Sequence, residues 1–276
     1  MKFSLLLFLA LATLSSAMPT PTTKDIKVFL CSDSTAAGYG PQTTGVQGFG
    51  YYLYPFFTST FVNSAKGGRS TRSFINEGLW AQLLDQTSPG DYVVIEMGHN
   101  DPGTPGTGGD VGVDRAVLSG VGEETVLVRN STGQDEVVRT FGSYLRQMVA
   151  DSRVVGAVPV LSGMVPLMEW TDYDTTLQKT WEFTEYSRDV SKTENVLFLD
   201  HTAYSVARFQ ELGYTEAMKL FPNDNIHTNS LGAEINAESF VTSLLCSKGP
   251  DATDFKGTLN EEAARIGYDC LDAEYR

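Results

Sequence analysis

Apolar and polar positions along the chain follow two alternating patterns. Short apolar runs of strand length are separated by longer segments in which apolar residues recur at helical spacing. This alternation predicts a mostly parallel sheet covered by helices on both faces. The expected strands lie near Ile26–Cys31, Thr60–Val62, Tyr92–Met97, Val154–Leu161 and Val196–Leu199. The expected helices cover Gly48–Phe57, Phe74–Leu84, Glu136–Ala150, Asp172–Val190, Ser230–Leu245 and, in pieces, Ser205–Leu220.

The predicted fold is a single three-layer α/β/α domain with a five-stranded, mainly parallel sheet of flavodoxin-like topology. Ligands in such folds bind beyond the carboxyl ends of the strands, so these positions are the ones to inspect. One long interruption, residues 102–135, is rich in Gly and Asp. A loop of that length inside a compact domain is usually functional or mobile. Weak alternation over Glu124–Arg129 indicates a hairpin within it.

The two ends of the chain differ from the domain between them. Residues 1–17 combine Lys2, an apolar run and small residues near Ala17, which is the pattern of a secretory signal peptide. The apolar run is too short for a membrane span. We therefore expect a secreted, extracellular protein with a domain over residues 18–246 and a polar tail over 247–276.

Cysteine usage agrees with an oxidising compartment. A disulfide between Cys246 and Cys270 would close a loop of roughly 25 residues and tie the tail to the domain. By the chain-entropy model it would stabilise the folded state by about 3 kcal/mol. Cys31 lies inside an apolar strand, where we expect a small buried thiol. Asn130 begins a glycosylation sequon in a polar region, so we expect it on the surface.

Charge and missing motifs exclude several function classes. A formal net charge of −14 argues against nucleic acid or an anionic membrane as the partner. No Gly-x-Gly-x-x-Gly follows a predicted strand, and no His/Cys cluster has metal-ligand spacing, so we expect no cofactor and no metal. The absence of Gly-x-Ser-x-Gly argues against the common α/β-hydrolase elbow. We expect a monomer.

Polar or glycine residues follow the ends of the predicted strands. Ser34 follows the first strand, Gly68 the second and Asn100 the third, while Asp224 and His227 precede the final helix. Each has an ordinary explanation: Ser34 as a helix N-cap, Gly68 as a turn, and Asp224 with His227 as a solvated turn. Because the carboxyl ends of parallel strands meet at one edge, we expect these residues to lie together.

Together these residue types meet the needs of ester hydrolysis. The reaction needs a hydroxyl, a base held in the right tautomer by an acceptor, and donors aimed at the oxyanion. Ser34 supplies the hydroxyl and His227 the base. Asp224, three residues earlier, can reach the imidazole in a single turn. The backbone N–H of Gly68 and the amide of Asn100 are candidate oxyanion donors.

The same residues resemble a known superfamily. Ser32-Asp33-Ser34, the Gly68 turn, Gly98-His99-Asn100-Asp101 and Asp224-x-x-His227 are similar to the four ordered blocks of the SGNH (GDSL-like) hydrolases. The phrases NSAKGGRSTRSF, EGLW, EMGHND and FPNDNIHTNSLGAE resemble secreted fungal rhamnogalacturonan acetylesterases. The resemblance covers the mature chain to about Cys246.

The resemblance implies a role for each matched position. Ser34 would be the nucleophile, His227 the base and Asp224 its orienting carboxylate. The oxyanion donors would be the N–H of Ser34, the N–H of Gly68 and the amide of Asn100. The substrate would be an acetylated plant cell-wall polysaccharide, rhamnogalacturonan first. In such a mechanism the His must be neutral in the first step, so activity should fall as the pH drops.

Three positions near the motifs bear on this assignment. Ser32 stands where the family usually has Gly, and its Cβ would tighten the turn. We expect Asp33 to brace the turn rather than act in catalysis. His201 follows Asp200 at another strand end, but adjacent residues on an extended chain diverge, so this pair is a poor orienting dyad.

The substrate is open at the sequence level. Arg69 and Arg72 flank the glycine turn, and they are either surface charges or contacts for the carboxylate of galacturonic acid. Acetylated xylan and short-chain lipid esters are alternative substrates. A non-catalytic carbohydrate-binding protein on the same fold is an alternative of another class.

Overall fold

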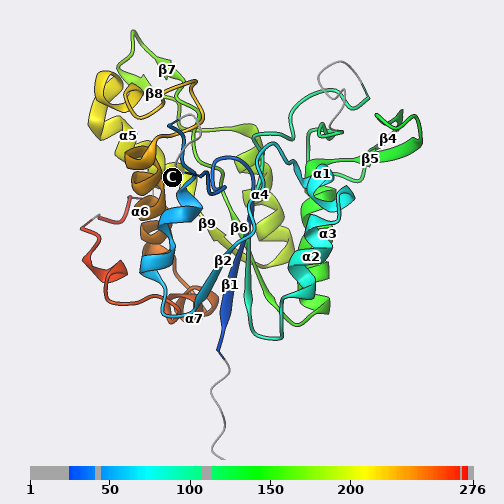
Figure 1. Ribbon diagram of the computed structural model, residues 1–276, viewed down its shortest axis with the longest axis horizontal. Helices are drawn as coiled ribbons and strands as arrows, with labels where there is room; N and C mark the ends of the chain where they lie inside the picture. The colour runs from blue at the N-terminus through cyan, green and yellow to red at the C-terminus, as the bar shows by residue number, and fades with distance from the viewer. Residues whose placement is uncertain (1–24, 41–44, 107–113, 268, 273–276) are drawn as a thin grey trace, which may run out of the picture.

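The computed structural model describes residues 25–40, 45–106, 114–267 and 269–272, and the predicted signal peptide lies outside them. A five-stranded parallel sheet in the order β2-β1-β3-β6-β9 forms its centre (Figure 1). Counting these strands along the chain gives 2-1-3-4-5, the flavodoxin-like order, so the predicted fold class is confirmed. The strands are β1 (Lys27–Ser32), β2 (Thr60–Asn63), β3 (Tyr92–Glu96), β6 (Val158–Ser162) and β9 (Leu197–Leu199).

Helices cover both faces of the sheet (Figure 1). Val28 and Leu30 of β1 pack into one apolar cluster with α6, whereas Phe29 and Cys31 pack into the other with α1 to α4. This division follows from the two-residue period of a strand buried on both faces. The helices are α1 (Thr71–Asn76), α2 (Leu79–Asp85), α3 (Phe141–Val154), α4 (Glu182–Glu194), α5 (His201–Met218), α6 (Ser230–Cys246) and α7 (Pro250–Lys256), with 3₁₀ helices η1 (Phe49–Tyr52), η2 (Tyr54–Phe56) and η3 (Ala263–Arg265).

Two predicted helices are interrupted. The segment Gly48–Phe57 forms η1 and η2 rather than one helix. A Cβ on Gly48 would lie 2.3 Å from the carbonyl oxygen of Ala37, so close backbone approach governs this segment. The segment Phe74–Leu84 is divided between α1 and α2, because Gly78 takes a left-handed conformation with φ of +76°.

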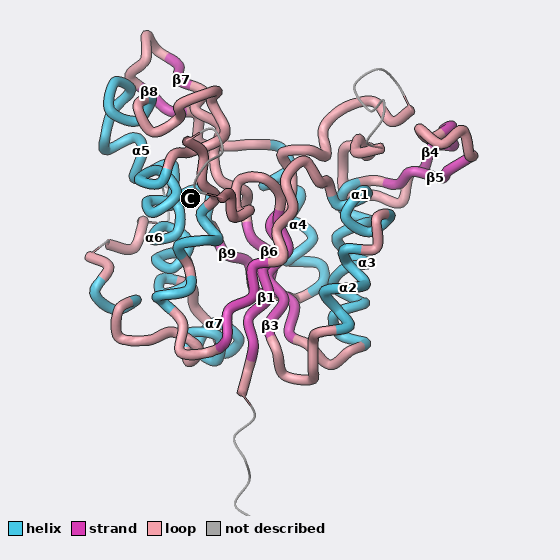
Figure 2. The backbone as a smooth tube through the Cα atoms, in the orientation of Figure 1, coloured by secondary structure: helices cyan, strands magenta, loops and turns pink. Residues whose placement is uncertain are grey.

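Two other predicted helices begin as β-hairpins. The segment Glu136–Ala150 starts within β5 (Asp135–Arg139), which pairs antiparallel with β4 (Thr125–Arg129) and confirms the expected hairpin. The segment Asp172–Val190 starts at the turn between β7 (Trp170–Thr171) and β8 (Thr176–Leu177). Figure 2 shows both hairpins projecting beyond the carboxyl edge of the sheet, on opposite sides. Pairing with another strand determines the structure of these two segments. The helical periodicity of a single segment does not reveal such pairing.

The C-terminal segment packs against the domain. Cys246 and Cys270 are joined by a disulfide, as their spacing allows. Phe255 of α7 is fully buried and stacks on Tyr92, with ring centroids 4.4 Å apart. The third cysteine, Cys31, is free and buried. Among the described residues, none of the helices combines the length and apolarity needed to cross a bilayer.

Candidate active site

Ser34 lies in a tight turn directly after β1. The Asp33 carboxylate accepts hydrogen bonds from the backbone N–H and the hydroxyl of Thr35, each at 2.9 Å, so Asp33 braces the turn as expected. The Tyr39 hydroxyl donates to the carbonyl oxygen of Ser34 at 3.0 Å. Over residues 34–40 a single turn follows the serine and no helix begins there, so the N-cap interpretation is wrong.

Asp224, His227 and Ser34 form a continuous chain of polar contacts. Oδ1 of Asp224 accepts from the backbone N–H groups of Ile226 and His227, at 2.8 and 2.7 Å, which fixes the carboxylate against the imidazole. Oδ2 of Asp224 lies 2.7 Å from Nδ1 of His227. Nε2 of the same ring lies 2.9 Å from Oγ of Ser34. The three side chains therefore have the order and spacing of a serine–histidine–carboxylate triad.

Asp224 is held in its charged form. Partial burial favours the neutral acid, but the hydrogen bonds from the backbone and ring of His227 outweigh it and lower the pKa of Asp224. The side chains of His227 and Asp224 are 29% and 39% exposed, so the site opens to solvent.

The Gly67-Gly68 turn lies directly against the serine. A Cβ on Gly67 would lie 3.6 Å from the Cβ of Ser34, and the N–H of Lys66 donates to the carbonyl of Ser32 at 3.0 Å. Gly68 has φ of +76°, a conformation that other residues rarely adopt. Glycine at this place is therefore required by the turn, and it leaves the backbone N–H unobstructed.

Asn100 lies beside the residue that precedes the serine. Its Nδ2 is 3.4 Å from Oδ2 of Asp33 and 3.3 Å from the carbonyl oxygen of Arg69. Its Oδ1 lies 3.3 Å from Nη1 of Arg115. All five positions predicted from the strand ends therefore gather at one edge of the sheet, although chain order separates Ser34 from His227 by 193 residues.

Asp101 ties this loop to α1. Its Oδ1 accepts from the backbone N–H of Thr71 at 2.9 Å and from the Thr71 hydroxyl at 2.5 Å. The carboxyl group is fully buried, and burial raises its pKa to about 7, although the Thr71 hydrogen bonds act in the opposite direction. The same burial raises the pKa of the neighbouring Cys31 thiol, with Asp101 adding to the effect, so the thiol stays neutral.

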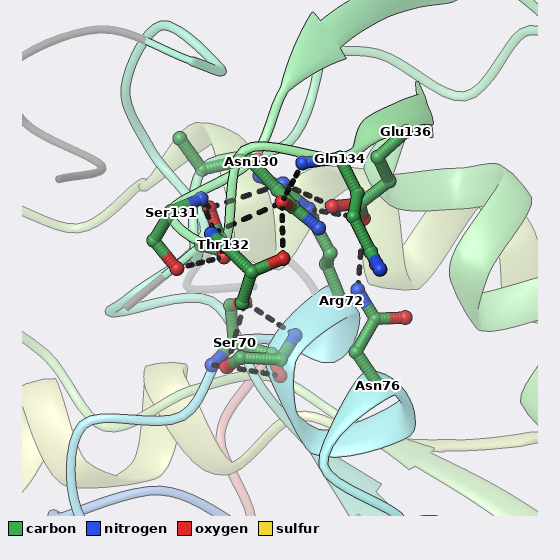
Figure 3. A network of polar contacts seen from close by, with 11 residues as sticks. Ser70, Arg72, Asn76, Asn130, Ser131, Thr132, Gln134 and Glu136 are labelled. Carbon is green, nitrogen blue, oxygen red and sulfur yellow. Dashed lines mark hydrogen bonds and ion pairs between the residues drawn. The ribbon is translucent and has the colours of Figure 1, made fainter. Parts of the chain in front are cut away.

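The prediction that Arg72 contacts substrate is wrong. Its side chain is completely buried between α1 and the β4–β5 hairpin, as Figure 3 shows. Nε and Nη2 each lie 2.8 Å from an oxygen of Glu136, and Nη1 donates to the carbonyl of Ala116 at 2.9 Å. A charged residue four positions after the glycine turn is expected to be exposed, but the hairpin from the long insertion covers Arg72.

Arg69 is partly exposed and already has partners. Its guanidinium pairs with Glu77 at 2.8 Å and donates to the carbonyl of Gly67 at 2.8 Å. It also borders a polar groove of about 360 Å³ that extends to the β4–β5 turn and includes Asn130. Asn130 is half-buried, and its Oδ1 accepts from backbone N–H groups of the turn (Figure 3). Glycosylation of Asn130 stays a prediction.

His201 does not join the site. It is fully buried and contacts Glu96 at 2.9 Å through Nδ1, rather than its neighbour Asp200. Tyr39 and Arg115, by contrast, contact the site and were missed from the sequence. Both come from irregular segments, where neither periodicity nor motif spacing marks a residue.

Comparisons with known proteins identify a family and several similar proteins. Residues 33–235 match the model of the GDSL-like lipase/acylhydrolase family. A rhamnogalacturonan acetylesterase of Emericella nidulans is 33% identical over 235 residues, which cover 85% of this chain and 91% of that protein. The rhamnogalacturonan acetylesterase RhgT of Bacillus subtilis is 26% identical over 226 residues, covering 76% of this chain and 85% of that protein.

Solved structures share the fold at low identity. The crystal structure of YxiM from Bacillus subtilis has a TM-score of 0.63 and 22% identity over 80% of this chain, which spans 56% of that one. An acetylxylan esterase from Geobacillus stearothermophilus has a TM-score of 0.52 and 16% identity, covering 79% of this chain and 93% of that one. With most of its length matched by the family model, the chain belongs to the GDSL-like lipase/acylhydrolase family and is a carboxylic ester hydrolase.

Proposed function

We propose that the protein is a secreted serine esterase that removes acetyl groups from plant cell-wall polysaccharide, rhamnogalacturonan first. The observation that carries the proposal is the chain of contacts from Asp224 Oδ2 through His227 to Ser34 Oγ, at 2.7 and 2.9 Å. The similarity to two rhamnogalacturonan acetylesterases supports the choice of substrate. The apolar leader in the sequence and the Cys246–Cys270 disulfide support export.

In the first half of the reaction, Ser34 Oγ attacks the acetyl carbonyl carbon while its proton moves to Nε2 of His227. Asp224 accepts the Nδ1–H of the ring, which keeps Nε2 free as the base and stabilises the imidazolium. The negative charge on the carbonyl oxygen is stabilised by the N–H groups of Ser34 and Gly68 and by the Asn100 amide. Collapse of this intermediate breaks the bond between the acyl carbon and the sugar oxygen, and His227 gives its Nε2 proton to that oxygen, which leaves as a hydroxyl.

In the second half, water replaces the sugar. His227 takes a proton from the water as its oxygen attacks the acetyl-Ser34 ester. The same donors stabilise the second tetrahedral intermediate. Collapse releases acetate, and the proton on Nε2 returns to Ser34 Oγ. Neutral imidazole is needed at the start of each half, so acid should inhibit both.

The test is acetate release from acetylated rhamnogalacturonan, acetylated xylan and a short-chain lipid ester. Ser34→Ala should abolish release from every substrate that the wild type hydrolyses. Ser88→Ala, in the turn before β3 at the amino edge of the sheet, is the matched control and should keep wild-type rates. Faster release from xylan or from the lipid ester would mean that this ester, and not rhamnogalacturonan, is the preferred substrate. Polysaccharide binding without any Ser34-dependent release of acetate would favour a non-catalytic binding protein.

The role of Arg69 stays a prediction and has its own arm of this test. If Arg69 contacts a substrate carboxylate, Arg69→Ala should reduce release from acetylated rhamnogalacturonan more than from a small neutral acetyl ester. The pairing with Glu77 leaves its side chain 31% exposed, so part of the guanidinium can reach a ligand. Equal losses of activity on both substrates would contradict a contact between Arg69 and the substrate carboxylate.

A further inference from the structure

Arg115 lies beside the proposed oxyanion donors, in the long insertion over residues 102–135, where no sequence motif marks it. Its Nη1 lies 3.3 Å from Oδ1 of Asn100. The same nitrogen would lie 3.9 Å from a Cβ built on Gly68, so the guanidinium borders both donors. The side chain is half-buried.

The partners of Asn100 define which end of its amide is oxygen. A guanidinium only donates hydrogen bonds, so Arg115 must face Oδ1. The carboxylate of Asp33 and the carbonyl of Arg69 only accept, so they must face Nδ2, which lies 3.4 and 3.3 Å from them. Flipping the amide would place an NH₂ group against the guanidinium and an oxygen against two acceptors.

Arg115 adds a charged contact at the other end of the amide. All three contacts of the Asn100 amide are long for N–H···O hydrogen bonds, at 3.3 or 3.4 Å, so no one of them holds the amide tightly by itself. Without Arg115, only the two contacts of Nδ2 would oppose a flip. A charged donor on Oδ1 also polarises the amide, which strengthens the N–H groups as donors.

The backbone around Arg115 is fixed by buried contacts. Arg72 donates to the carbonyl of the next residue, Ala116, at 2.9 Å. The N–H of Val117 donates to the carbonyl of Asp101 at 3.0 Å, which ties the insertion to the residue that follows Asn100. The buried Arg72, wrongly predicted as a substrate contact, therefore helps to hold the segment that carries Arg115.

We propose that Arg115 is a positioning residue that holds the Asn100 amide with its N–H groups toward the acyl oxygen. This inference rests on the proposed function, since it assumes that Asn100 is an oxyanion donor. It differs from substrate recognition, because a positioning residue should act on every ester, including small neutral ones. Its effect should appear in kcat rather than in KM.

The experiment is a double-mutant cycle on a small neutral acetyl ester, with Arg115→Met, Asn100→Ala and the double variant. Arg115→Met should lower kcat roughly 10-fold with little change in KM, which is less than the roughly 100- to 1000-fold expected for loss of the donor itself. In the Asn100→Ala background the same change should have almost no further effect. Arg115→Lys, which keeps a charged donor, should recover part of the rate.

Controls separate the possible failures. Arg129→Met, on the exposed part of the same insertion, should leave kcat unchanged, and thermal unfolding should show that each variant is folded. Wild-type kcat in Arg115→Met, or an equal loss in the Asn100→Ala background, would overturn the inference. So would a loss confined to KM for carboxylate-bearing esters. If turnover does not depend on Ser34, the proposed function fails, and this inference fails with it.

Discussion

In two histidine–carboxylate pairs of this protein, Nδ1 of the ring contacts a carboxyl oxygen. The pairs differ in burial and in the partner of the second ring nitrogen. Nδ1 of His227 lies 2.7 Å from Asp224, and Nδ1 of His201 lies 2.9 Å from Glu96. The first pair is partly exposed, whereas the side chains of the second are 0% and 1% exposed. The second ring nitrogen meets the Ser34 hydroxyl in one case and the carbonyl of Asn236, at 2.8 Å, in the other.

That second partner decides what each ring can do. A hydroxyl can donate to Nε2 of His227, so this nitrogen can act as a base. A carbonyl only accepts, so Nε2 of His201 must carry a proton, and its Nδ1 faces a carboxyl group that also accepts from Ser162. Either that imidazole carries two protons or Glu96 is protonated. In both states His201 cannot take a proton from a serine, and its contacts hold α5, α6 and β3 together.

The largest difference between the pairs should appear in turnover. His227→Leu should lower kcat by a factor on the order of 10⁴ or more, because it removes the base from a triad that acts as a unit. The melting temperature should change little, since the ring is partly exposed. Single-turnover kinetics and thermal unfolding of the same variant measure both. A variant that kept substantial kcat would show that another group serves as the base.

The matched change in the buried pair should appear in stability. His201→Leu leaves the Glu96 carboxyl and the Asn236 carbonyl without a buried partner, at a cost of about 3 kcal/mol in the free energy of unfolding. Urea denaturation gives this value, and kcat per folded molecule should stay close to wild type. Glu96→Gln, which can still hydrogen-bond the ring, should cost less. Loss of kcat in a fully stable His201→Leu variant would contradict the assignment of the His227 pair to turnover and of the His201 pair to stability.

Two carboxyl groups near the site should give opposite pH signatures. The pKa of Asp101 is raised from 3.8 to about 7, so in that interval the folded state keeps a proton that the unfolded state releases. Its contribution to stability is therefore complete below about pH 3.8 and is lost as pH rises toward 7. The pKa of Asp224 is lowered, so its contribution is present above the ordinary value and is lost in acid.

The variant Asp101→Asn, a neutral mimic of the protonated acid, tests the contribution of Asp101 to the pH dependence of stability. It should flatten the decline in stability between about pH 4 and pH 7, because an amide cannot release a proton. Melting temperatures of the wild type and the variant across this range measure the difference. Parallel curves for the two proteins would show that Asp101 does not titrate in that interval.

The smallest effect is expected at Ser32, which lies opposite Glu96 in the β1–β3 register. Its hydroxyl is completely buried and has no hydrogen-bond partner among the described residues. Ser32→Ala should therefore raise the free energy of unfolding by about 1 kcal/mol and leave kcat unchanged. A measurable loss of stability would mean that the hydroxyl is satisfied, and that the departure from the usual family glycine is favourable.

Residues with a strong local pattern were predictable from the sequence. Apolar runs of strand length located all five central strands, with errors only at their ends. The site followed from a rule of parallel sheets, that strand carboxyl ends meet, together with Asp224 and His227 in one turn. Hairpins were harder, because β5 and the β7–β8 turn depend on cross-strand partners that a periodic count along one segment cannot see.

Three side chains show what local patterns could not determine. Arg72 looked like a surface charge, and a hairpin distant in the sequence buries it against Glu136, 64 residues away. Arg115 carries no motif and reaches Asn100 because backbone contacts hold its loop there. His201 stands next to Asp200 in sequence but pairs with Glu96, 105 residues away. Each outcome depends on which element covers the residue.

The sequence by itself determined the order of the five central strands, the export signal that we expect, and the four positions that gather with Ser34. These depend on local propensity and on the geometry of parallel sheets, which act over a few residues at a time. Only the tertiary structure decided which histidine meets a hydroxyl, which arginine is buried and which one contacts Asn100. Burial and the identity of a hydrogen-bond partner are properties of contacts between distant segments, and those contacts exist only in the folded chain.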